Sequence, residues 1–235
     1  MTEHPAKLAA IDGPLDPTLS HVDIWAFDLD NTLYPASCNL FAQVDRLIHG
    51  YIVEHVGLEP DAARTLQKSF WRQHGTTMNG LMAEHGVDPH HFLDYVHAID
   101  HSPVAANPAL DRALGALEGT KYIFTNASVR HAEAVLDRLG VAHHFVDIFD
   151  IVAADFHPKP QDHFYDSFID RHGIDPARTI LIDDMAKNLA PAHARGMTTV
   201  HIRTASDHAM EGHDSDHVHH GAEDLLEWLE ALLEA

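Results

Sequence analysis

Cysteine is nearly absent from this chain of 235 residues, in which Cys38 is the single example. One thiol cannot form a disulfide within the chain, and it cannot build a cysteine-based zinc site without a second cysteine beside it. This composition is typical of a reducing compartment. We therefore expect a cytoplasmic location.

Long apolar runs are also missing, since no stretch approaches the roughly 20 residues of a membrane-spanning helix. Residues 1–20 are polar, acidic and proline-containing, unlike a secretory signal peptide. No membrane partner is expected. Because hydrophobic residues make up 45% of the chain, it can bury a large core, and we expect a monomer or a homodimer.

Basic residues are scarce: 15 lysines and arginines face 36 acidic residues, giving a formal net charge of −21. This charge repels nucleic-acid backbones, so nucleic acid is not an expected partner. A phosphate-bearing small molecule would need a local positive focus from a metal ion, a lysine or helix N-termini. The 23 histidines should make the charge less negative as pH falls through about 6.5.

Strand and helix patterns alternate along most of the chain, which predicts an α/β fold with a parallel sheet between two helical layers. Expected strands end at four polar stations, and ligands of such sheets bind beyond the carboxyl ends of the strands. The expected strands are residues 21–30, 121–125, 148–153, 179–182 and 198–202, and the expected helices 109–117, 129–139, 164–172, 189–195 and 222–233.

Helical periodicity interrupts this alternation after the first strand, where glycines and prolines punctuate four expected short helices. We predict a polar extension over residues 1–20, an α/β core over 21–36 and 104–235, and a helical cap over 37–103.

The first polar station holds Asp28 and Asp30, one residue apart where a strand breaks into a loop. A carboxylate can attack phosphorus and form an anhydride that water cleaves readily, while its neighbour moves the proton. A lone pair of this kind more often caps a helix. The apolar strand before it and the full segment FDLDNTLYP (27–35) favour the catalytic interpretation.

Two further stations are weak signals when taken alone. Thr125 and Asn126 follow an expected strand, where a hydroxyl and backbone amides can hold a phosphate oxygen, although turn chemistry is the commoner role. Lys159 follows the third core strand and could neutralise phosphate charge, although most lysines are simply solvated.

The fourth station, Asp183 and Asp184, ends a strongly apolar strand. Adjacent carboxylates repel one another unless a cation lies near them, and Mg²⁺ prefers such oxygen ligands. Asn188, four residues on, could orient the ligands from one helical turn away. Helix capping is the alternative interpretation.

In their order and at their strand ends, the four stations FDLDNTLYP, IFTNAS, HPKP and LIDDMAKN resemble the motifs of the haloacid dehalogenase superfamily. The resemblance implies a Rossmann-like core with a C1-type cap and a Mg²⁺-dependent reaction. The resemblance implies that Asp28 is the nucleophile and a metal ligand, and that Asp30 is the acid/base and binds the metal through its backbone carbonyl. It further implies that Thr125 is a phosphate ligand, that Lys159 is the bridging lysine, and that Asp183 or Asp184, with Asp184 favoured, is a metal ligand.

The second aspartate, Asp30, argues for a phosphatase, since dehalogenase members lack it. The segments HGTTMNGL, DYVHAID, FTNASVRHAEAVLDRLG and IDDMAKN are further similar to the pyrimidine 5′-nucleotidase branch, which implies UMP and CMP as substrates. A sugar phosphate or a phosphoglycolate-like acid remains the alternative, because the cap rather than the motifs decides the substrate. Aromatic residues that could stack on a base, but are more often core, are Tyr34, Phe41, Phe70, Trp71 and Tyr95.

Histidines gather in a late segment that we expect to be a mobile loop, residues 207–220. They are His208, His213, His217, His219 and His220, with Asp214 and Asp216 between them. A solvated segment is the favoured interpretation, and a non-catalytic metal-binding protein built on it is the alternative from another class. No role is assigned to His131, His143 or His144.

Overall fold

The computed structural model describes residues 17–204 and 209–234. Most of the expected N-terminal extension, residues 1–16, and His208 of the histidine-rich segment lie outside these residues. None of the helices described is long and apolar enough to cross a membrane.

Within the described residues, six strands form one parallel sheet in the order β3-β2-β1-β4-β5-β6. The strands are β1 (Ile24–Phe27), β2 (Thr120–Phe124), β3 (Asp147–Phe149), β4 (Thr179–Asp183), β5 (Thr198–Ile202) and β6 (His220–Ala222). The chain builds outward from β1 to β3 on one side and then returns to β4 on the other. The crevice between β1 and β4 is therefore the switch point where such sheets bind ligands.

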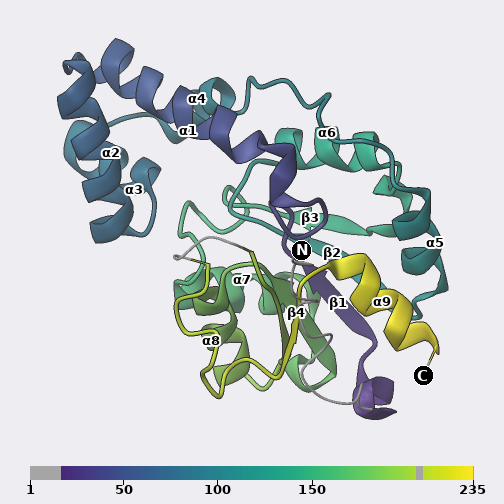
Figure 1. The fold of residues 1–235 in the computed structure, drawn as a ribbon. Helices are drawn as coiled ribbons and strands as arrows, with labels where there is room; N and C mark the ends of the chain where they lie inside the picture. The colour runs from purple at the N-terminus through teal and green to yellow at the C-terminus, as the bar shows by residue number, and fades with distance from the viewer. Residues whose placement is uncertain (1–16, 205–208, 235) are drawn as a thin grey trace, which may run out of the picture.

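Helices cover both faces of this sheet (Figure 1). They are α5 (Pro108–Ala116), α6 (Val129–Leu139), α7 (Asp162–His172), α8 (Ala186–Ala194) and α9 (Leu225–Glu234). Side chains of α5, α6 and α9 share one buried cluster with Trp25 and Phe27, whereas those of α7 and α8 share another with Ala26. Alternate residues of β1 thus face opposite layers, as a buried strand requires.

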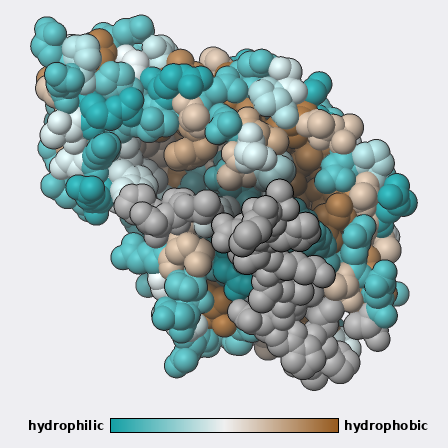
Figure 2. Space-filling view, viewed as in Figure 1, coloured by the Kyte–Doolittle hydropathy of each residue, from teal (hydrophilic) through white to brown (hydrophobic). Residues whose placement is uncertain are grey.

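Four further helices are inserted between β1 and β2 and project from the core (Figure 1). They are α1 (Leu40–Tyr51), which continues as one π-helical turn, η3 (Ile52–Val56), and then α2 (Pro60–His74), α3 (Thr77–His85) and α4 (Pro89–Val96). Proline occupies the first turn of α2 and of α4, where its missing N–H costs nothing. The surface over the insert is largely hydrophilic (Figure 2).

The expected three-layer α/β fold with a helical insertion after its first strand is confirmed. The third strand ends at Phe149 rather than near residue 153, because the chain turns there. The helix α8 begins at Ala186, three residues earlier than expected. Remaining short helical turns are η1 (Pro17–His21), η2 (Ala36–Cys38), η4 (Ala142–His144) and η5 (Pro176–Arg178).

The end of the histidine-rich segment is not the loop that we expected. His220 pairs with Val200 at the edge of the sheet and begins β6. The ring of His219 accepts a hydrogen bond from the backbone N–H of Thr199 at 3.1 Å. The sequence His-Gly-Ala has little strand propensity, and this strand forms because β5 offers it an unpaired backbone edge.

Gly119 lies where the chain enters β2 and passes close to the backbone just before β1. Its φ of +100° is unfavourable for other residues, and an added Cβ would lie 2.5 Å from the backbone oxygen of Asp23, which accepts the first ladder hydrogen bond from Thr120. We expect Gly119→Ala to lower the free energy of unfolding by about 2–4 kcal/mol. Gly140→Ala, at φ +80° with open space around it, should cost only about 1–2 kcal/mol. Equal losses in urea unfolding would contradict this account.

Candidate active site

Three carboxylates meet at the switch point of the sheet. Asp28 directly follows β1, while Asp183 ends β4 and Asp184 follows it. The two strands are paired, and the backbone N–H of Asp28 extends the ladder by donating to the oxygen of Ile182 at 2.8 Å. All three side chains are buried, and one ligand atom from each lies within 4.8 Å of the others.

Lys159 places one positive charge among these carboxylates. Its Nζ donates to Oδ1 of Asp28 at 2.7 Å, to Oδ2 of Asp183 at 2.7 Å and to the backbone oxygen of Phe124 at 2.8 Å. Burial by itself lowers the pKa of Lys159, but the charges of Asp183 and Asp28 outweigh it and hold this pKa above its usual value. The two carboxylates therefore favour the charged ammonium form of Lys159.

One ammonium does not balance three buried carboxylates. Burial raises the pKa of Asp28, and the charge of Asp183 adds to this effect against the opposing pull of Lys159. Burial, followed by the charges of Asp28 and Asp183, likewise raises the pKa of Asp184. Such crowding favours a bound cation, and the donors are hard oxygens of the kind that Mg²⁺ prefers. The residues present therefore fit a divalent metal ion.

The two adjacent carboxylates of β4 have different surroundings. Asp183 accepts hydrogen bonds from Lys159, from the backbone N–H of Met185 and, through both of its oxygens, from the side-chain amide of Asn188. Among the described residues, none donates a hydrogen bond to the Asp184 side chain. Asp184 is thus the carboxylate left available to a ligand, whereas Asn188 orients Asp183.

Thr125 and Asn126 follow β2, beside the same crevice. The Thr125 hydroxyl accepts from the backbone N–H of Ala127 at 3.0 Å. The side-chain oxygen of Asn126 accepts from the Lys159 N–H at 2.8 Å, and its amide nitrogen donates to the Lys159 backbone oxygen at 3.3 Å. Asn126 therefore anchors the loop that carries the lysine, and its phosphate-binding role stays a prediction.

Asp30 lies two residues beyond Asp28 and is held from two sides. Its Oδ1 accepts from the Tyr34 hydroxyl at 2.5 Å and from Nε2 of His131 at 2.9 Å. Burial alone would raise the pKa of Asp30, but the charge and hydrogen bond of His131, helped by Tyr34, lower it to about 2. The side chain is ionised before any phosphate binds, and the negative charge of a phosphate would act to raise this pKa.

His131 is the functional candidate that sequence reasoning missed. It is 1% exposed, its Nδ1 lies 3.1 Å from Nε2 of His101, and its ring stacks on that of His97 at 4.7 Å. Burial, with the charge of His131 next, lowers the pKa of His97 to about 3. The available signal was helical periodicity, since His131 shares the buried face of α6 with Val135 and Leu139.

The inserted helices reach the core beside this crevice. The side-chain amide of Asn79, in α3, donates to the backbone oxygen of Phe156 at 2.9 Å. The Nζ of Lys187 lies over the ring of Trp71, in α2, at 4.6 Å from its centroid. Of the other aromatic residues considered for stacking, Tyr34 and Phe70 are buried and Phe41 is exposed, while Tyr95 donates to Glu54.

Solved structures with the same fold include three haloacid dehalogenase (HAD) proteins. A HAD phosphatase from Thermococcus onnurineus has a TM-score of 0.58 and 16% identity, covering 90% of this chain and 98% of its own. A HAD-hydrolase from Bacillus subtilis, bound to magnesium, has a TM-score of 0.57 and 16% identity, covering 91% and 99%. The L-2-haloacid dehalogenase of Xanthobacter autotrophicus has a TM-score of 0.51 and 17% identity, covering 81% of each chain. These likenesses concern the fold.

A curated relative, Phosphate metabolism protein 8 of Saccharomyces cerevisiae, is 26% identical over 211 residues. The match covers 80% of this chain and 63% of the relative, so the chain spans less than two thirds of that protein. The model of the haloacid dehalogenase-like hydrolases matches residues 22–196, a span that contains the carboxylates, the lysine and the inserted helices. The chain belongs to the family of haloacid dehalogenase-like hydrolases.

Proposed function

We propose that the chain is a Mg²⁺-dependent phosphatase that hydrolyses a small phosphate monoester through an aspartyl-phosphate on Asp28. The observation that carries this proposal is the buried group of Asp28, Asp183 and Asp184 with Lys159 between two of them. A second carboxylate, Asp30, lies close by and is held by its own hydrogen bonds. Catalysis of phosphoryl transfer consists almost entirely of positioning the reacting groups and stabilising their charge.

The metal ion would be held by Asp28, Asp184 and the backbone oxygen of Asp30, with Asp183 behind them. When bound, Mg²⁺ supplies charge neutralisation for the phosphate oxygens. Lys159 adds a fixed positive charge and, together with the Thr32 hydroxyl at 3.0 Å, fixes the orientation of the Asp28 carboxylate. Thr125 is proposed to hold a further phosphate oxygen.

Catalysis then has two steps that regenerate the enzyme. An oxygen of Asp28 attacks phosphorus, and the bond from phosphorus to the ester oxygen breaks. The departing alcohol takes a proton from Asp30, which has taken it up from solvent after the charge of the bound phosphate has raised its pKa. Water next attacks the acylphosphate and loses a proton to Asp30, which releases inorganic phosphate and frees the Asp28 carboxylate. His131 holds Asp30 in place for both transfers.

The helical insert, residues 37–103, is proposed to be a cap that closes over the site, excludes water and selects the leaving group. We propose pyrimidine nucleoside 5′-monophosphates, UMP and CMP, as substrates, on the similarity of the motifs and cap segments to that branch. Trp71 supports this assignment, because its ring lies against Lys187, three residues after Asp184. This contact brings an aromatic side chain of the insert to the helix that follows Asp184.

The substrate proposal is tested by phosphate release from UMP, CMP, dTMP, AMP, GMP and several sugar phosphates, with Mg²⁺ and with EDTA. We expect Mg²⁺-dependent preference for UMP and CMP. Asp28→Asn should reduce kcat by at least about 10³-fold, because it removes the nucleophile. Preference for another substrate would contradict the proposed pyrimidine nucleotide substrate but agree with the proposed mechanism. No phosphate release from any substrate would contradict the proposal that the chain is a phosphatase.

His131 is tested as the residue that positions Asp30. We expect His131→Leu to lower kcat by about 10–100-fold with little change in KM, since a small displacement of a catalytic group is costly. His131→Gln keeps an N–H donor and should recover part of this loss. Steady-state kinetics of both variants, with circular dichroism to verify folding, provide the measurement. Equal kcat values for the two variants would show that the hydrogen bond to Asp30 does not matter.

A further inference from the structure

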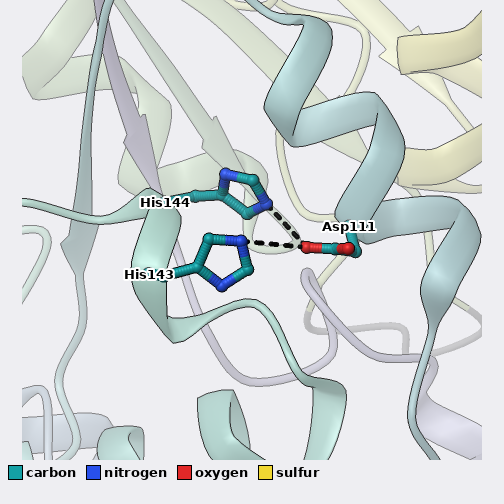
Figure 3. Close-up of side chains that lie close together, drawn as sticks. All are labelled: Asp111, His143 and His144. Atoms are coloured by element: carbon teal, nitrogen blue, oxygen red, sulfur yellow. Dashed lines mark hydrogen bonds and ion pairs between the residues drawn. The ribbon is translucent and has the colours of Figure 1, made fainter.

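A second group of ligand-type side chains lies away from the catalytic carboxylates. Asp111 comes from α5, and His143 and His144 come from η4. The Oδ1 of Asp111 is 2.8 Å from Nε2 of His144 and 3.2 Å from Nε2 of His143. Figure 3 shows both rings pointing a nitrogen at the same carboxylate oxygen. We infer that these three residues form a binding site for Zn²⁺ or a similar divalent transition metal ion.

The spacing suits such an ion. Bonds of about 2.0–2.2 Å from Zn²⁺ to nitrogen and oxygen place two ligands of a tetrahedral site about 3.3–3.5 Å apart. The two observed separations, 2.8 and 3.2 Å, need to grow by only a few tenths of an ångström. His143 is 66% exposed and Asp111 39% exposed, so both side chains can make this adjustment. Because His143 is largely exposed, solvent can supply a fourth ligand.

The third ligand is held more firmly. The side chain of His144 is 14% exposed, and its ring packs against the backbone of α5 at Gly115. A Cβ at Gly115 would lie 3.3 Å from Cε1 of this ring, so the absence of a side chain there makes room for it. One ligand is therefore preorganised on the helix that also supplies Asp111, which reduces the ordering cost of binding.

The donor set distinguishes this site from the catalytic one. Two imidazoles and one carboxylate suit Zn²⁺, Cu²⁺ or Ni²⁺, whereas the all-oxygen group around Asp28 suits Mg²⁺. The positions differ as well: η4 precedes β3 and lies where strands begin, while the carboxylates follow the ends of parallel strands. Within residues 17–204 and 209–234 these are the two groups of three or more such side chains that could hold an ion, and neither draws on residues 209–220.

Binding would join two segments that are distant in sequence. Helix α5 is the first helix of the core after the insert, and η4 lies between α6 and β3 in the chain. An ion held by both would tie α5 to this connection and stabilise the folded chain by an amount that grows with the logarithm of the free ion concentration. The net charge of −21 favours the approach of cations to the surface.

The test is titration calorimetry of the full chain with Zn²⁺ in excess Mg²⁺, a readout that is independent of turnover. We expect His143→Ala and Asp111→Ala each to weaken the tightest Zn²⁺ binding by at least about tenfold. The matched control His213→Ala, from the histidine-rich segment, should leave it unchanged. Because His143 is largely exposed, its replacement should leave the circular dichroism spectrum intact.

Identical isotherms for the wild type and His143→Ala, or no Zn²⁺ binding by the wild type, would overturn the inference. Zinc-edge X-ray absorption of a sample with one equivalent of Zn²⁺ gives a second measurement. Two imidazole nitrogens among the ligands of the wild type, and fewer in His143→Ala, support the site, whereas ligation by oxygen alone would refute it.

Discussion

The buried contact of Lys159 with Asp28 and Asp183 is the interaction on which the rest of the site depends. Each carboxylate sits at the end of a central strand, out of water, where an uncompensated charge would cost several kcal/mol. The lysine comes from a separate loop after β3, and Asn126 fixes that loop through its backbone. Four chain segments are thus joined at one point, and the sheet brings all of them to the same edge.

The catalytic carboxylates carry more negative charge than Lys159 can balance, which lowers stability and favours the binding of a cation. Three carboxylates and one ammonium leave a negative site, and Asp184 keeps its oxygens available because Asp183 takes the hydrogen bonds of Asn188 and Lys159. A buried carboxylate with a raised pKa and a costly charge is characteristic of functional sites. A cation of the kind that the proposed reaction requires would offset this negative charge.

Histidines act differently in three parts of this chain. His131 is buried, and its two ring nitrogens contact Asp30 and His101. His101 belongs to the segment that leads from the insert back to the core. His144 packs on α5, where it converges with its neighbour on Asp111. His219 bonds to the backbone of β5. Their roles follow from burial and geometry rather than from their number or their clustering in sequence.

The sequence by itself determined the fold class, the order of elements, the positions of Asp28, Thr125 and Asp184 at strand ends and that of Lys159 in the loop after the third strand. It could do so because hydrophobic periodicity and local motifs are properties of adjacent residues. Only the tertiary structure decided that His131 reaches Asp30, that Asn126 bonds to the lysine loop and that β6 completes the sheet. The physical reason is distance along the chain: His131 and Asp30 are 101 residues apart, and only packing of α6 against the loop after β1 brings them within hydrogen-bonding reach.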